Sequence, residues 1–230
     1  MAAIPRIIKN VYRRVVPITI RNSPIIDWLK AKMFPHDMIY DAEYYETIVE
    51  GPAVRSARMI SDTVISELRP ARVVDIGCGT GALLQALRER GCEVFGMEYS
   101  DAALAYCRAR HLEVAKFDLE NDVFEDGRTF DVAVSMEVAE HLPERISDRY
   151  VDLLTRLSRI IVFTAAPPGQ GGADHVNEQP PEYWISKFQR RKFDYAQELS
   201  RRWRERWKAA GDVESWYYQN LMIFRRIENS

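Results

Sequence analysis

From Arg72 onward, short apolar runs alternate with stretches in which apolar residues recur at helical spacing. The short runs predict β-strands, and the stretches between them predict crossover helices. We expect strands over residues 72–77, 93–98, 112–117, 130–136, 159–165 and 220–226, and helices over residues 81–90, 101–110, 143–157, 182–190 and 195–210. Nearly continuous apolar stretches such as residues 132–134 are typical of a sheet covered on both faces. The pattern therefore predicts an α/β fold with a doubly wound sheet.

The first 35 residues follow a different pattern and are predicted to form an N-terminal helical arm, with one domain over residues 36–230. Apolar residues in this arm recur at helical spacing, with basic residues between them: Ile4, Ile7, Ile8, Val11, Val15 and Val16. One interpretation is a lid packed on the domain. The other is a basic amphipathic segment lying on an anionic membrane surface.

Composition narrows the class of protein. With 230 residues, 47% of them hydrophobic and 29% charged, the chain fits one globular domain. The three cysteines lack metal-type spacing and fit reduced thiols, so we expect a cytoplasmic protein, peripheral at the membrane if the arm binds one. The formal net charge is −2 and the pI about 6.1, which argues against a nucleic-acid partner.

A glycine-rich turn after the first predicted strand carries the strongest chemical signal. Asp75 precedes a G-x-G-x-G stretch formed by Gly77, Cys78, Gly79 and Gly81 with Thr80. Glycines let the backbone turn sharply and approach a ligand closely. The Asp75 carboxylate would repel a pyrophosphate but attract a cationic ammonium or sulfonium group.

This stretch resembles the first motif of class I S-adenosylmethionine (SAM) dependent methyltransferases, and later motifs follow in the family's order. The resemblance implies a seven-stranded Rossmann-like sheet and SAM as cofactor. By the same resemblance, Glu98 would bind the ribose hydroxyls with Tyr99 beside it. Asp118 and Leu119 would frame the adenine. Residues 130–135 resemble the family's fourth-strand motif, and Ser135 is its last residue.

Two further segments are candidates for parts of the site. Residues 40–45 resemble a segment that folds over the cofactor in many members of the family, although aromatic packing alone would also explain them. Residues 167–181 form a loop rich in glycine and proline. This loop follows the fifth predicted strand, at the sheet edge where ligands bind in such folds.

Acidic and imidazole side chains gather after the fourth predicted strand. Glu137, Glu140 and His141 stand at i, i+3 and i+4, which in a helical turn places all three on one face. His141 could act as a general base on an acceptor hydroxyl, supported by Glu137. Alternatively these three residues and His175, in the loop after the fifth strand, are ligands of a divalent metal, with Mg²⁺ favoured.

This set of residues resembles the metal-dependent O-methyltransferases of the ubiquinone pathway and the small-RNA terminal 2′-O-methyltransferases. Both groups act on a hydroxyl with a neighbouring oxygen that can also reach the metal. Many metal-free relatives carry a Glu-His pair here to shape the turn, so a metal-free base and purely structural roles stay open.

The acceptor is the least determined feature. Residues 175–184 mix amides, carboxylates and aromatic rings, which suits sugar recognition and resembles methyltransferases of glycan pathways. We therefore expect O-methylation of a small acceptor, a sugar or other vicinal diol. One alternative is a metal-free methyltransferase of a quinone precursor, polyketide or other aromatic metabolite. Another is a SAM-binding module without catalysis.

Overall fold

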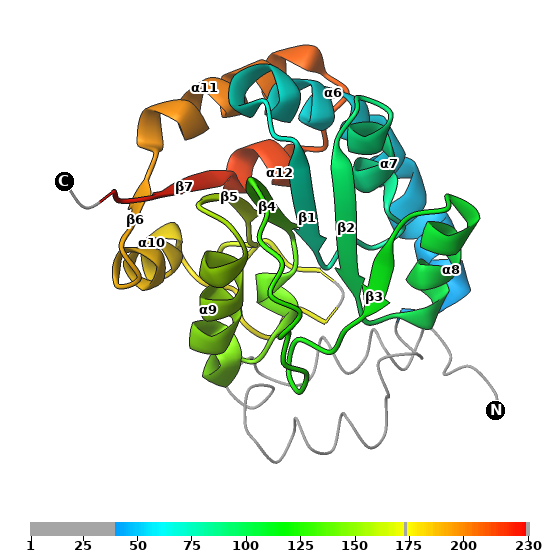
Figure 1. Ribbon diagram of the computed structural model, residues 1–230, viewed down its shortest axis with the longest axis horizontal. Helices are drawn as coiled ribbons and strands as arrows, with labels where there is room; N and C mark the ends of the chain where they lie inside the picture. The colour runs from blue at the N-terminus through cyan, green and yellow to red at the C-terminus, as the bar shows by residue number, and fades with distance from the viewer. Residues whose placement is uncertain (1–39, 173, 229–230) are drawn as a thin grey trace.

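The computed structural model describes residues 40–172 and 174–228, which surround one seven-stranded sheet (Figure 1). Its strand order is β3-β2-β1-β4-β5-β7-β6. The strands are β1 (Arg72–Ile76), β2 (Glu93–Glu98), β3 (Val114–Lys116), β4 (Val132–Met136), β5 (Ile160–Thr164), β6 (Phe193–Tyr195) and β7 (Met222–Arg226). The first five are parallel, and β7 is antiparallel to both of its neighbours. The doubly wound α/β fold is confirmed.

Helices connect the strands and cover both faces of the sheet (Figure 1). Before β1 come α5 (Ala42–Tyr44), the π-helix η1 (Tyr45–Val49) and α6 (Glu50–Leu68). The remaining α-helices are α7 (Ala82–Arg88), α8 (Asp101–Ala109), α9 (Ser147–Leu157), α10 (Pro181–Gln189), α11 (Gln197–Ala210) and α12 (Ser215–Asn220). Two 3₁₀ turns, η2 (Ala139–His141) and η3 (Glu144–Ile146), link β4 to α9.

Alternate residues of the central strands enter two separate cores. Val73 and Val132 face α6, α7 and α11, whereas Val74 and Ala133 face α9 and α10. All four side chains are buried, because a parallel sheet with helices on both sides leaves neither face to water. Asp75 follows this alternation and lies on the α6 side.

The chain reverses its direction of winding between β1 and β4, which are neighbours in the sheet. From β1 it proceeds through β2 to β3, and then returns to β4 and β5 on the other side. Ligands bind outside the carboxyl ends of the strands at such a switch point. Asp75, Glu98 and Met136 end or nearly end their strands at this edge.

Several elements differ from the sequence-based predictions. The helices α5, α6 and α12 and the short strand β6 were not predicted, and residues 195–196 precede α11 instead of beginning it. The expected helical turn over residues 137–141 is wrong. Glu137 has a left-handed backbone with φ of 55°, and only Ala139–His141 form a 3₁₀ turn.

The predicted arm over residues 1–35 lies outside the described residues, so the division into an arm and a domain stays a prediction. Within residues 40–172 and 174–228, no helix combines the length and the apolar character needed to cross a bilayer.

Candidate active site at the switch point of the sheet

The glycine-rich turn joins β1 to α7 and is fastened to β2. The amides of Gly77 and Cys78 both donate to the carbonyl oxygen of Met97, over 2.8 and 3.1 Å. Gly77 has φ of 73°, and a Cβ there would collide with the side chain of Val138. Only glycine meets both demands, so this position keeps the turn close to the chain that follows β4.

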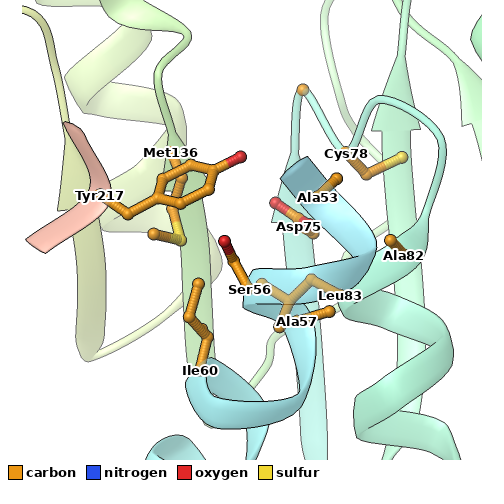
Figure 2. A pocket seen from close by; sticks show the side chains of 11 residues that line it. Ala53, Ser56, Ala57, Ile60, Asp75, Cys78, Ala82, Leu83, Met136 and Tyr217 are labelled. Atoms are coloured by element: carbon orange, nitrogen blue, oxygen red, sulfur yellow. The ribbon is translucent and has the colours of Figure 1, made fainter. Parts of the chain in front are cut away.

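Asp75 lines a small cavity of about 60 Å³ formed by β1, β4, α6, α12 and the glycine-rich turn with the start of α7 (Figure 2). Ser56, Met136 and Tyr217 approach from the facing elements. Burial, together with the nearby charge of Glu98, raises the pKa of Asp75 to about 7. The cavity therefore offers a carboxyl group whose charge depends on pH near neutrality, beside a turn predicted to bind a cationic cofactor.

Glu98 organises the turn at the end of β2. Its Oε1 accepts hydrogen bonds from the amides of Tyr99 and Ser100, each over 2.8 Å. Its Oε2 accepts from the amide of Gly79 over 2.9 Å. A carboxylate has about four acceptor positions, so a ribose hydroxyl would share or replace these bonds. Glu98 thus connects the glycine turn to the start of α8.

The other predicted cofactor residues differ in how their side chains are placed. Asp118 shapes its own turn by accepting from the Glu120 amide and the Asn121 side chain, while Leu119 packs against the core. Tyr99 is 37% exposed. Ser135 is fully buried, and its hydroxyl donates to the Ile76 carbonyl and bonds with Tyr150. The Ser135 side chain therefore packs in the core and does not point to the edge of the sheet where the cofactor is expected.

Three of the four predicted metal ligands converge. One ligand atom from each of Glu140, His141 and His175 lies within 4.8 Å of the others. The two imidazole rings meet edge to face, with their centroids 4.9 Å apart. Donor atoms bonded to one divalent ion at ~2.0–2.6 Å are separated by roughly 3–5 Å, so the spacing of these three residues suits a metal.

Glu140 is the most unusual member of the cluster. Its side chain is completely buried, and neither carboxylate oxygen has a hydrogen-bond partner among the described residues. Burial, reinforced by the nearby charge of Glu137, raises the pKa of Glu140 well above its usual range. A buried carboxylate without a partner costs free energy, and a bound cation would offset that cost.

Each imidazole is held through its Nδ1 atom. The Nδ1 of His175 lies 2.9 Å from Oε1 of Glu178, whose pKa is lowered by this contact and by two backbone amides despite partial burial. The Nδ1 of His141 lies 3.0 Å from the hydroxyl of Tyr40. Because Nδ1 is engaged in both rings, Nε2 is the candidate metal-binding atom of each. Close packing of the His175 ring on Gly172 leaves no room for a Cβ there.

Glu137, predicted as a catalytic residue and as the fourth ligand, is held differently. Its Oε1 accepts from Asn220 over 3.0 Å and its Oε2 accepts from Gln170 over 2.8 Å. The Asn220 amide also donates to the Gln170 side chain. The prediction that Glu137 shares one helical face with Glu140 and His141 is wrong, because its left-handed backbone turns the chain before the 3₁₀ turn begins.

Sequence reasoning missed several residues that support the site. Glu178, Gln170 and Asn220 position the predicted residues, and Tyr217 lines the cavity beside Asp75. Glu178 lies only three residues after His175, a spacing that could have marked it as a partner. Asn220 carried no such signal, because it is 83 residues away from Glu137 along the chain.

Comparison with known proteins agrees with this architecture. Residues 74–161 match a family described as a methyltransferase domain. The ubiquinone biosynthesis O-methyltransferase of Nitrosomonas europaea is 35% identical over 92 residues, 37% of this chain and 39% of that protein. Its counterpart in Methylococcus capsulatus is 33% identical over 113 residues, 46% of this chain and 47% of that protein. The matches thus span less than half the length of these curated relatives.

A solved structure of magnesium protoporphyrin IX methyltransferase from Synechocystis PCC 6803, with bound SAM, has a similar fold. The similarity covers 99% of this chain and all of that chain, with a TM-score of 0.56 and 17% identity. At this identity the likeness concerns the fold alone. The chain therefore has the Rossmann-like fold of class I methyltransferases, and residues 74–161 within it match a methyltransferase domain. Part of the chain is also similar to O-methyltransferases of ubiquinone biosynthesis.

Proposed function

We propose that the chain transfers a methyl group from SAM to a hydroxyl oxygen of a small aromatic acceptor, of the quinone-precursor type, that carries a second oxygen beside the first. The similarity to O-methyltransferases of ubiquinone biosynthesis supports an aromatic acceptor over the sugar expected from sequence. Burial of Trp184 in the core also weakens the sugar hypothesis, because this residue is 1% exposed and cannot stack on an acceptor.

In this proposal SAM lies across the carboxyl ends of β1 and β2. The ribose hydroxyls would donate hydrogen bonds to the Glu98 carboxylate, and Asp118 with Leu119 would lie against the adenine. The ionised Asp75 carboxylate would attract the cationic end of the cofactor. Gly77, Cys78, Gly79 and Gly81 would let the backbone lie against the cofactor.

We further propose that Glu140, His141 and His175 hold a divalent cation. The fit rests on the convergence of their ligand atoms and on the buried Glu140 carboxylate without a partner. When bound, the cation would lower the pKa of an acceptor hydroxyl and orient the oxygen pair. Mg²⁺ was expected from sequence, but two imidazoles and one carboxylate also suit Mn²⁺ or Zn²⁺.

The protein residues would contribute mostly positioning. Methyl transfer needs in-line attack of the acceptor oxygen on the methyl group, so a fixed distance and angle lower the barrier. His141 would accept the hydroxyl proton at Nε2, with its Nδ1–H donating to the Tyr40 oxygen; the 3.0 Å contact between these two atoms supports this role. A metal-free reaction with His141 as the base is the second candidate, and the same hydrogen bond supports it.

One set of assays tests these proposals. Purified protein is incubated with SAM and a catechol, a matched monophenol or a methyl glycoside, and S-adenosylhomocysteine (SAH) and the methylated product are measured by mass spectrometry. We expect methylation of the catechol, loss of turnover with EDTA, and recovery with Mg²⁺ or Mn²⁺. Full turnover after exhaustive chelation would favour the metal-free reaction. Methylation of the glycoside alone would favour a sugar acceptor, and absence of SAH with every acceptor would favour a non-catalytic module.

A further inference from the structure

Tyr40 forms hydrogen bonds in two directions. Its hydroxyl lies 3.0 Å from Nδ1 of His141, in the candidate reaction centre. Its backbone carbonyl accepts a hydrogen bond from the hydroxyl of Ser100, also over 3.0 Å. One residue thus touches both the turn that follows β2 and the 3₁₀ turn that follows β4.

Ser100 belongs to the turn organised by Glu98. The Ser100 amide donates to Oε1 of Glu98, whose Oε2 accepts from Gly79. Five residues are thus linked in series by hydrogen bonds, in a path from Gly79 through Glu98, Ser100 and Tyr40 to His141, with the covalent structure of each residue joining one bond to the next. Ribose hydroxyls bound to Glu98 would share its carboxylate with the Ser100 amide, so they would act on Ser100 and through it on Tyr40.

Aromatic packing holds the Tyr40 ring independently of its hydroxyl. The ring meets Tyr44 edge to face with centroids 5.3 Å apart, and it meets His141 in the same way at 5.9 Å. Tyr44 in turn packs against the buried Tyr45 at 5.5 Å. Removal of the Tyr40 hydroxyl should leave this packing intact, so the hydroxyl can be tested separately from the ring.

We infer that Tyr40 is a positioning residue that couples occupancy of the cofactor site to the state of the His141 imidazole. In the arrangement that we propose, His141 donates from Nδ1–H to the Tyr40 oxygen, which favours the tautomer whose Nε2 carries the lone pair needed to bind a metal or accept a proton. Cofactor on Glu98 would fix Ser100 and Tyr40, and thereby this tautomer. The inference rests on the proposed function, because it takes Glu98 as the cofactor residue.

Nuclear magnetic resonance of the four histidines tests the inference directly. The full chain is labelled with ¹⁵N-histidine, and the His141 ring signals are assigned with a His141→Gln variant. SAH is then titrated into the wild type and into Tyr40→Phe. We expect SAH to shift the wild-type His141 signals toward the Nδ1–H tautomer. In Tyr40→Phe, SAH should still bind while the His141 tautomer stays mixed. The exposed His111 provides an internal reference.

Two matched variants sharpen the comparison. Tyr44→Phe removes a hydroxyl from the adjacent ring and should retain the His141 response. Ser100→Ala cuts the same path at its other end and should weaken the response as Tyr40→Phe does, which also serves if Tyr40→Phe fails to fold. By calorimetry, SAH should raise the Mn²⁺ affinity of the wild type at least about fivefold, a coupling at the lower end of the usual range, and leave that of Tyr40→Phe nearly unchanged.

The outcomes separate the inference from the proposed function. A His141 response in Tyr40→Phe equal to that of the wild type would overturn the inference while leaving the proposed function intact. Failure of the wild type to bind SAH would overturn the proposed function itself. If Mn²⁺ does not bind the wild type, the metal part of that proposal fails and the histidine tautomer alone decides the role of Tyr40.

Discussion

The backbone carbonyl of Glu140 accepts a hydrogen bond from the amide of Val176 over 2.9 Å. The following amide, of Asn177, donates to the same oxygen over 3.0 Å. The loop after β5 is therefore fastened to the 3₁₀ turn after β4 directly beside His175. This anchor explains how an imidazole in a glycine-rich loop can be held against His141 without support from a helix or strand.

Glu140→Gln should increase stability and abolish metal binding. The substitution removes a buried carboxylate that has no hydrogen-bond partner, so at pH 8 the free energy of unfolding should rise by about 1–3 kcal/mol. Denaturant unfolding with and without Mn²⁺ measures both effects. Glu144→Gln, at an exposed position nearby in the sequence, is the matched control and should leave stability unchanged. Equal effects of the two substitutions would contradict the distinction drawn between them.

Glu178→Gln should weaken metal binding without removing a ligand. The Glu178 carboxylate orients His175 through Nδ1, and loss of such a partner typically costs about 10–100-fold in metal affinity. Isothermal titration with Mn²⁺ measures the change. Glu182→Gln, at a neighbouring exposed position, should leave the affinity unaltered. An unchanged affinity in Glu178→Gln would argue against a metal at His175.

Glu98→Ala should weaken SAH binding by about 1.5–3 kcal/mol, the range for hydrogen bonds to a charged group. Calorimetry on a variant shown to be folded provides the measurement. Asp101→Ala is a suitable control. Asp101 is the first residue of α8, and its carboxylate forms a solvent-exposed ion pair with Lys116. Unchanged affinity in Glu98→Ala would remove Glu98 from the cofactor site.

Stability should depend on pH through Asp75. The pKa of Asp75 is about 7 in the folded chain, against an ordinary value of 3.8, so the folded state holds its proton where the unfolded state has lost it. The stabilisation from this group is thus complete below about pH 4, falls as the pH rises, and is gone above about pH 7. The unfolding free energy of the wild type minus that of Asp75→Asn should fall as the pH rises from 5 to 8. A difference that is constant over this range would contradict the raised pKa.

The parts of the molecule that sequence could predict are those with a local signal. The parallel strands β1, β2, β4 and β5 are apolar runs, and the glycine-rich turn has its own spacing. Strand β6 has three residues, too few for a period to be visible. The placement of Glu137 depends on a positive φ and on Asn220 from a distant helix, neither of which a helical spacing rule contains.

The candidate site also has a part that sequence could predict and a part that it could not. Residue types predicted the cluster of Glu140, His141 and His175, because carboxylates and imidazoles were expected at the carboxyl ends of neighbouring strands. The second contacts of each imidazole, to Tyr40 and Glu178, depend on packing in three dimensions. Sequence could therefore indicate which groups lie close together but not which of their atoms face one another.

The position of β7 between β5 and β6 has a consequence for synthesis on the ribosome. Residues 222–226 are made after every other strand, yet they fill an interior place in the sheet, and Asn220 just before them holds Glu137. A nascent chain that lacks residues 220–226 would expose two unpaired strand edges and would lack one of the two amide donors to Glu137. The surroundings of Glu137 should thus form only after β7 has paired with β5 and β6, rather than gradually during elongation.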